Sequence, residues 1–351
     1  MAVSARPSIR VRRLAGFIAF LLVTFAFLFS QPRSVSRGQD SSPTDLYLPL
    51  VFGPGAVPDP QIAGCPLQPS DNIWNTRIDG LPLHSRSSAY IASIGRDTSL
   101  HPDFGTVWEG DPIGIPYTTV PGDQPKVAVT FGYDDESDPG PYPIPPNPPI
   151  EAGGDHHILI VDRDHCILYE LFGAYQQGGN WHAGSGAIFD LRANGLRPAG
   201  WTSADAAGLP ILPGLVRYEE VAGGEIRHAI RFTAARTQKA YVWPARHYAS
   251  SITDLNVPPM GQRFRLKASL DISGFSGEVQ VILKAMQRYG IILADNGSNW
   301  FISGSPDPRW NDDVLVSAFR QIHGSDFEAV DVSGLMIDPD SGQARQTPWP
   351  K

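Results

Sequence analysis

Four motifs that would identify common enzyme classes are missing from this 351-residue chain. It contains no GxSxG nucleophile elbow, no HExxH zinc-binding sequence, no P-loop and no GxGxxG after a strand. Serine-hydrolase, zinc-protease and nucleotide-binding functions therefore lose their usual support. No internal repeat of fixed period is visible either.

Basic residues are scarce, with 28 Lys and Arg against 36 Asp and Glu. The first 30 residues hold four of the Arg and no acidic residue, so the remainder carries 24 − 36 = −12 charges. Such an acidic chain is a poor candidate for nucleic acid or for anionic membrane surfaces. We expect it to act on neutral or cationic material, or to bind acidic groups through local Arg clusters.

Residues 14–29, LAGFIAFLLVTFAFLF, are uncharged and mostly large and apolar, and four Arg precede them. A cationic segment followed by an apolar segment is typical of a secretory signal. We expect residues 1–30 to be a signal peptide or an uncleaved N-terminal anchor. The apolar segment is a little shorter than the roughly 20 residues that a membrane-spanning helix needs. The rest is expected to be secreted, or held on the outer face of the membrane by this segment alone.

Cysteine is also rare, because Cys65 and Cys166 are the only two in the chain. In an oxidising compartment such a pair predicts one disulfide, with two buried thiols as the alternative. Residues 31–60 are rich in Pro, Ser and Gly, which indicates a linker. We expect residues 61–351 to form a single β-rich globular domain, since 42% hydrophobic content argues against disorder.

Many short strand-like segments between Gly and Pro turns favour a mostly-β fold, a β-sandwich or jelly-roll-like domain with two late α-helices. The helices are expected at 277–289 and from Asp307 to about residue 322, with a shorter helix at 88–94. Strands are expected at 126–133, 156–162, 166–174, 225–234, 239–243, 263–270 and 327–331. Asn296-Gly297 predicts a hairpin joining 291–295 to 298–303. Seven prolines between residues 134 and 149 predict an extended surface loop.

The densest group of titratable side chains lies in residues 153–182, which hold four of the nine histidines. A two-residue turn at 163–164 would place His157 directly opposite Glu170 on neighbouring strands. Such a pair suits general acid–base catalysis, with His157 as base and Glu170 as its orienting group or as acid. The alternative is a structural polar pair inside the sandwich. Adjacent His156 and His157 point to opposite faces of a strand and are not expected to ligate one metal.

The next segment, residues 176–182 (QQGGNWH), reads as a polar, glycine-rich loop. Aromatic rings stack on sugar faces while amides and imidazoles bind hydroxyl groups, so this composition suits carbohydrate. The expected substrate-binding residues are Trp181, Gln177 and Asn180, with His182 as a second candidate base and Tyr175 holding sugar. The alternative is an ordinary loop whose Trp packs into the core.

A cationic and aromatic set follows in the second half of the chain: Arg217, Tyr218, His228, Arg231, Arg246 and His247. β-Elimination on a uronate needs a cation for the carboxylate, a base at C5 and a proton donor for the leaving oxygen. We therefore predict that Arg217 binds a substrate carboxylate, with buried salt bridges as the alternative.

Asp134, Asp135, Glu136 and Asp138 form an acidic run. Calcium sites use several oxygen ligands on a short loop, but this spacing is not that of an EF-hand. We expect a solvated acidic surface, with calcium binding as the alternative. No other metal or cofactor is predicted.

The stretch from Asp155 to Ser298 carries the segments DHHILIVD, LYELFGAY, SADAAGLPILPGLVRYEEV, IRHAIRF and LKAMQRYGIILADNGS. In these segments it resembles a group of secreted bacterial proteins to which no activity is assigned. The resemblance spans roughly two fifths of the chain. It implies export and a common fold, and it supplies no catalytic residues.

These observations predict a secreted polysaccharide-active enzyme, a glycan hydrolase or lyase, whose partner is a carbohydrate polymer. The site is expected between the 153–182 hairpin and the proline-rich loop. The alternative is a non-catalytic extracellular glycan-binding or surface protein. A metallohydrolase would need His182 with two of His157, His228 and His247 in one cluster.

Overall fold

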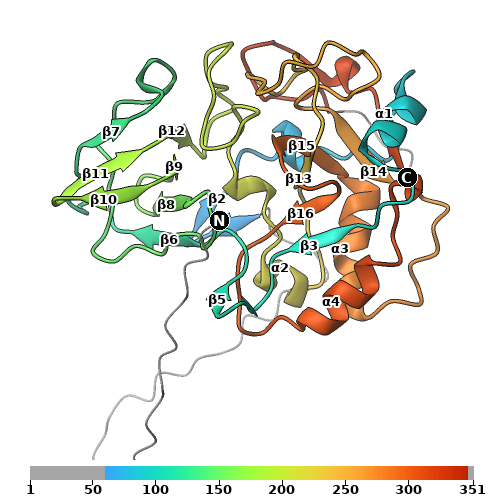
Figure 1. Ribbon diagram of the computed structural model, residues 1–351, viewed down its shortest axis with the longest axis horizontal. Coiled ribbons are helices and arrows are strands. Elements are labelled where there is room, and N and C mark those ends of the chain that lie inside the picture. The colour runs from blue at the N-terminus through green and yellow to red at the C-terminus, as the bar shows by residue number, and fades with distance from the viewer. Residues whose placement is uncertain (1–59, 347–351) are drawn as a thin grey trace, which may run out of the picture. The chain divides into compact units, whose positions relative to one another are not determined.

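Two mixed sheets form the framework of residues 60–346, the part of the chain that this computed structural model describes. Strand exceeds helix, 28% against 17%, so the mostly-β, sandwich-like fold is confirmed. The smaller sheet and its neighbouring strands lie on one side of Figure 1, and the larger sheet with its helices lies on the other. The described residues belong to one compact unit of the chain.

The strands and helices are short, as the frequent Gly and Pro predict. The strands are β1 (Gln61–Ile62), β2 (Cys65–Pro66), β3 (His101–Asp103), β4 (Val107–Trp108), β5 (Asp111–Pro112), β6 (Tyr117–Val120), β7 (Val129–Phe131), β8 (Ile158–Asp162), β9 (Ile167–Phe172), β10 (Tyr175–Gln177), β11 (Asn180–Ala183), β12 (Ser185–Asp190), β13 (Ile230–Ala234), β14 (Arg263–Leu266), β15 (Ile291–Asn296), β16 (Phe301–Ser303) and β17 (Phe327–Ala329). The α-helices are α1 (Ser87–Ile94), α2 (Tyr218–Ala222), α3 (Gly277–Arg288) and α4 (Asp312–Phe319).

The four-stranded sheet has the order β12-β9-β8-β6 and is buried on both faces. Every residue of β8 is buried, which explains why its sequence, ILIVD, is nearly continuous in apolar residues. On one face, Ile158 and Ile160 pack with Val129 and Ala183 of the three-stranded sheet β10-β11-β7. The other face packs against the segment around residues 204–215. The four-stranded sheet and the three-stranded sheet together form a two-layer sandwich.

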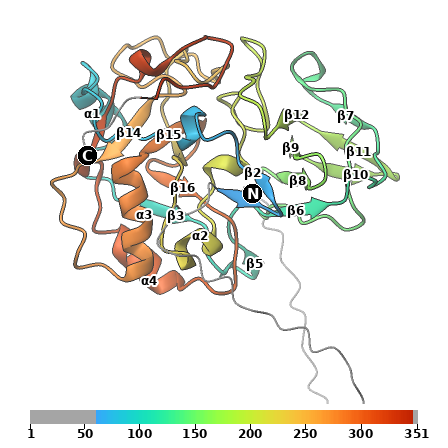
Figure 2. The same ribbon diagram turned by 180° about the vertical axis from the view of Figure 1, so that it is seen from behind.

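The six-stranded sheet has the order β17-β14-β15-β13-β16-β3. Helix α3 contacts β14, α4 contacts β3 and α1 contacts β17, and the helices lie beside this sheet in both views (Figure 1, Figure 2). Val279, Ile282, Leu283 and Met286 form the buried face of α3, as their helical spacing predicts. The predicted helices at 88–94 and 277–289 are therefore confirmed to within one residue at either end.

The predicted hairpin at 291–303 is wrong. β15 and β16 are not neighbours, because β13 lies between them, parallel to β15 and antiparallel to β16. The fully buried ring of Trp300 stacks on Phe232 and on Phe327, with ring centroids 5.6 and 5.1 Å apart. These long-range aromatic contacts outweigh the local turn preference of Asn296-Gly297.

The last helix also begins later than predicted. Asp307 closes a tight turn with the N–H of Trp310, and α4 starts only at Asp312. Asn311 is the residue that caps it, through a side-chain oxygen that accepts from the Val314 N–H at 3.1 Å. The predicted strand at 239–243 is absent from the described structure, which has only isolated bridges there.

Between residues 60 and 346, no helix combines the length and the apolar composition that crossing a membrane requires. The expected signal or anchor at 1–30 lies outside the described residues, as does all of the expected linker except its last residue.

Cys65 and Cys166 form the predicted disulfide, with Cα atoms 5.3 Å apart and a sequence separation of 101. Both are buried. The bond ties β2, at the start of the described chain, to the turn between β8 and β9.

Removing this bond should destabilise the protein strongly. Because the loop that it closes is long, the chain-entropy model gives about 4–5 kcal/mol for Cys65→Ala combined with Cys166→Ala. Urea unfolding with and without reductant measures this difference. An unfolding midpoint that matches the oxidised wild type would contradict the prediction, and reductant should leave the double variant unchanged.

Candidate functional site

Arg231, at the start of β13, binds two carboxylates that come from distant parts of the chain. Its Nε donates to Oδ2 of Asp205 at 2.8 Å, and its Nη2 donates to Oδ1 of Asp205 and to Oδ2 of Asp295, each at 3.0 Å. Its Nη1 donates to Oγ of Ser303 at 2.6 Å. Since one nitrogen binds both acids, the two acceptor oxygens lie at most 3.0 + 3.0 = 6.0 Å apart.

Asp205 and Asp295 have different environments. Both oxygens of Asp205 are bound to Arg231, and its side chain is fully buried. Asp295 lies near the end of β15 and its side chain is 22% exposed. Burial, and then the negative charge of Asp205, raise the pKa of Asp295 to about 7, against the opposing charge of Arg231. Asp295 can therefore hold a proton near neutral pH and donate it to a bound molecule.

A cavity of about 300 Å³ opens beside Asp295, between the two main sheets. Phe172 and Ser185 contribute from the four-stranded sheet, and Asp295 and Asn296 contribute from the six-stranded sheet. The remaining lining residues are Tyr133, Glu136, Thr202, Ser203, Ala204, Asp205, Ala206, His247 and Ala249. No Lys or Arg is among these residues, so the lining is acidic.

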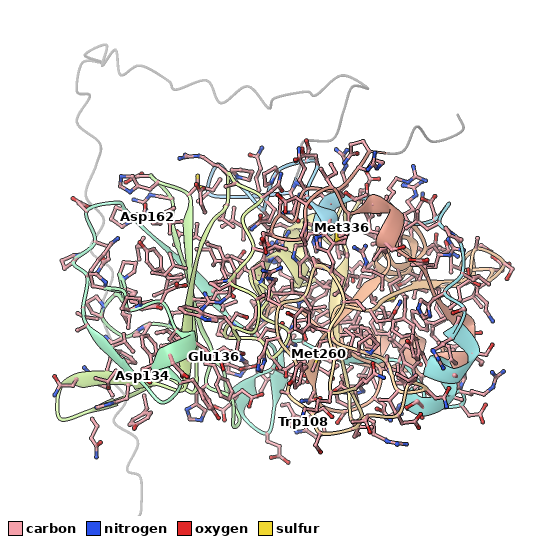
Figure 3. All side chains as sticks on the ribbon, turned by 90° about the horizontal axis from the view of Figure 1, so that it is seen from above. Trp108, Asp134, Glu136, Asp162, Met260 and Met336 are labelled. Atoms are coloured by element: carbon pink, nitrogen blue, oxygen red, sulfur yellow. A yellow bond between two sulfur atoms is a disulfide. The ribbon has the colours of Figure 1, made fainter. Side chains whose placement is uncertain are left out.

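His247 faces the same cavity and is held by a backbone carbonyl. Its Nδ1 lies 2.8 Å from the oxygen of Ala206, which can only accept, so we assign the proton to Nδ1. Neutral His247 then keeps a lone pair on Nε2, which lies 3.8 Å from Oε2 of Glu136. Figure 3 shows Glu136 nearer than Asp134 to the part of the molecule that holds Met260. The cavity thus brings together a proton donor, Asp295, and a proton acceptor, His247.

His157 does not lie opposite Glu170. Asp162 pairs with Ile167, so four residues separate the strands where a two-residue turn was expected. Leu159 is the residue that pairs with Glu170, and His157 lies just before β8. The predicted register is therefore wrong. Cys166 sits in this turn with a left-handed φ of 57°, and Oδ1 of Asp162 accepts from the N–H groups of Asp164 and His165 at 3.1 and 3.0 Å.

His157 is instead buried between two acceptors. Its Nδ1 contacts the Glu151 carboxylate, and its Nε2 lies 3.0 Å from the carbonyl oxygen of Ala204. Because both partners accept, both ring nitrogens must donate, and the ring is an imidazolium. Burial alone lowers the pKa of His157, but the hydrogen bond and charge of Glu151 raise it overall. His157 thus ties the end of the proline-rich loop to the residue before Asp205.

Glu170 holds the backbone of the 211–212 turn. Its Oε1 accepts from the N–H groups of Ile211 and Leu212 at 3.0 and 2.9 Å, and no part of the residue is exposed. Burial raises the pKa of Glu170 to about 7, although both N–H groups lower it. Glu170 does not line the cavity, so this geometry supports the structural alternative for the residue.

Residues 175–183 form a hairpin of β10 and β11 rather than a loop. Gly178 and Gly179 make its turn with left-handed φ angles of 58° and 85°. Tyr175, 51% exposed, stacks on His182 with ring centroids 5.2 Å apart. Gln177 and Asn180 are exposed at the tip, while the half-buried Trp181 packs against the sandwich core. These five residues stay together on the outer hairpin, and none of them lines the cavity.

Arg217 is buried and cannot reach a substrate carboxylate. Its Nη2 pairs with Oε1 of Glu220 at 2.6 Å, and its Nη1 donates to the carbonyl groups of Leu212 and Leu215. His228 binds the other oxygen of Glu220 at 3.1 Å. The buried salt bridge, which was the alternative reading of the sequence, is what the structure shows.

The acidic run at 134–138 is divided among separate partners. Asp138 pairs with Arg197 at 2.5 Å, and Glu136 accepts from the Thr202 N–H at 2.9 Å. Within residues 60–346, no group of three or more His, Cys, Asp or Glu side chains is placed to hold a metal ion. This finding also removes the geometric basis for the His182-centred metal cluster.

Sequence reasoning overlooked the two acids of the site. Asp205 belongs to none of the predicted sites, and Asp295 was assigned only to the predicted hairpin at 291–303. One signal was available: Arg231 stands in the apolar strand sequence IRFTA, and a buried Arg requires acidic partners. Which acids these are depends on contacts across 26 and 64 residues, which no local pattern specifies.

No protein-family model, curated protein or solved structure matches the chain. The site is therefore interpreted from its own geometry.

Replacing Glu170 by Gln should preserve the fold. The amide oxygen can still accept from both N–H groups and no charge remains buried, but the amide NH2 replaces Oε2, which also accepts from the Ile211 N–H at 2.9 Å. A buried acid with a raised pKa loses stability as pH rises from its ordinary 4.5 to about 7, so the stability of Glu170→Gln relative to the wild type should rise by about 3 kcal/mol across this range. Urea unfolding across this range measures the difference. A loss of turnover in the folded variant would instead indicate a catalytic Glu170.

The Glu151→Gln variant should lose the charge that keeps His157 protonated. A raised histidine pKa stabilises the fold below the ordinary 6.5, and this stability is lost as pH rises through the higher folded value. We expect the variant to be less stable than the wild type by about 3 kcal/mol below pH 6.5, with a smaller difference at alkaline pH. A pH-independent difference in unfolding free energy would contradict the imidazolium assignment.

Proposed function

We propose that this protein is a secreted glycan hydrolase that works by acid–base catalysis in the cavity beside Asp295. The observation that carries the proposal is the pairing of a carboxyl group whose pKa is about 7 with an imidazole lone pair across one cavity. The disulfide supports an oxidising, extracellular setting.

In the proposed reaction, Asp295 donates its proton to the glycosidic oxygen as the bond from that oxygen to the anomeric carbon breaks. His247 Nε2 removes a proton from water as the water oxygen bonds to the anomeric carbon. The Glu136 carboxylate, 3.8 Å away, stabilises the imidazolium that forms. Return of this proton to Asp295 restores the enzyme, so the net reaction is hydrolysis.

The lining of the cavity favours a sugar over other substrates. Tyr133 and Phe172 offer aromatic surface, and Ser185, Thr202 and Asn296 offer polar groups. Hydrolysis is favoured over uronate elimination because no Lys or Arg lines the cavity, and the nearby Arg231 is already paired with two carboxylates. The reaction that we propose therefore uses different residues from those that the sequence suggested.

The Asp295→Asn variant should lose at least 100-fold in rate, the usual contribution of a general acid, without loss of fold. Reducing-end release from a panel of neutral, amino and uronate glycans measures it. Because the acid must be protonated, wild-type activity should fall as pH rises through about 7. Asp123→Asn, at an exposed site outside the cavity, is the matched control.

An Asp295→Asn variant that keeps its rate would contradict this assignment. If no glycan is cleaved but one binds saturably, the non-catalytic glycan-binding alternative is favoured. The exposed, stacked Tyr175 and His182 would then be the first residues to replace.

A further inference from the structure

A second and larger cavity, of about 980 Å³, runs along the edge strand β3 between the β4–β5 hairpin and α4. Trp108 and Val107 line it and are 68% and 54% exposed. Figure 3 shows Trp108 at the outer boundary of the molecule. Adjacent apolar side chains this exposed mark a binding surface, because leaving them in water is unfavourable.

Flat rings also form part of the cavity wall. His101 of β3 and Phe301 of β16 are paired in register, and their ring centroids are 4.2 Å apart. Together with the indole of Trp108, these rings offer the apolar faces on which pyranose rings stack. The groove is therefore suited to several linked sugars rather than to one.

The charges in the groove select the kind of sugar. Asp103, Asp312 and Asp313 line it with one cation, Arg320. Burial, and then the charge of Arg320, lower the pKa of His101, so this ring adds no positive charge near neutral pH. The carboxylate of Asp312 is bound to the N–H and hydroxyl of Thr106.

Within the described residues, the carboxylates of Asp103 and Asp313 show no hydrogen bond or ion pair. Burial raises the pKa of Asp103, against the opposing charge of Arg231. Two unpaired acidic groups beside aromatic rings complement a sugar that carries a protonated amine. They disfavour uronates and sulfated glycans by repulsion.

The groove and the cavity of the candidate site adjoin the same row of side chains. Asp103 pairs in register with Ser303, whose hydroxyl binds Arg231, and Arg231 binds Asp295. This row crosses from β3 through β16 and β13 to β15, which is three strand spacings or about 14 Å. A glycan of several residues is long enough to contact both ends of the row.

We propose that the β3 groove binds a glycan chain with free amino groups, and that the same chain extends to the cavity beside Asp295. The first part of this proposal, glycan binding in the groove, concerns binding alone. The second part, extension of the chain to the cavity, rests on the function proposed above, because the groove is then a subsite for the chain that is cleaved.

The test uses the full-length Asp295→Asn protein, so that the probe is not consumed. Calorimetry at mildly acidic pH compares a glucosamine hexasaccharide with the same chain fully N-acetylated. We expect the free-amine chain to bind at least tenfold more tightly and to weaken as salt is added. Trp108→Ala and Asp103→Asn should each reduce its affinity at least tenfold.

Two exposed residues outside the groove provide matched controls: Leu255→Ala for Trp108 and Asp123→Asn for Asp103. Equal or tighter binding of the N-acetylated chain, no binding of either chain, or unchanged affinity in Trp108→Ala would each overturn the proposal. Trp108-dependent binding of a free-amine chain that the wild type does not cleave would support the groove and contradict the hydrolase. The thermal midpoint of each variant confirms that it is folded.

Discussion

The ion pair of Arg231 with Asp205 and Asp295 is the interaction on which the candidate site depends. A buried guanidinium is tolerated only when charged partners surround it, and here they come from two separate segments. Arg231 therefore fixes Asp205 against the end of the six-stranded sheet. It also leaves Asp295 beside a second negative charge, which adds to burial in raising the pKa of this carboxyl group to about 7.

The four-stranded sheet is connected to this centre by buried polar contacts. His157 binds the carbonyl of Ala204, immediately before Asp205, and Glu170 binds the backbone of the 211–212 turn. The two residues that the sequence suggested for catalysis, His157 and Glu170, thus hold the segment that supplies Asp205. These hydrogen bonds keep the 204–212 segment between the two sheets, where the cavity opens.

Local patterns predicted the elements whose stabilising contacts are local. The apolar stripe of α3, the buried β8 strand and the disulfide all follow from spacing and composition. Patterns failed where a distant contact decides the structure. β13 lies between β15 and β16, and the carboxylates of the site meet only through Arg231. The sequence also singled out the titratable residues of 153–182, but their positions depend on the register between β8 and β9. Because the turn is two residues longer than predicted, His157 does not lie opposite Glu170.

The central claim is that Asp295 carries a proton near neutral pH because it is buried and because the charge of Asp205 lies beside it. Titration of the ¹³C-labelled Asp295 carboxyl group by NMR tests this directly, in the wild type and in Asp205→Asn. The account predicts a pKa near 7 in the wild type and a lower value in the variant, since the neighbouring charge is gone and Arg231 is left to Asp295. A wild-type value near the ordinary 3.8, or one that the substitution leaves unchanged, would contradict it.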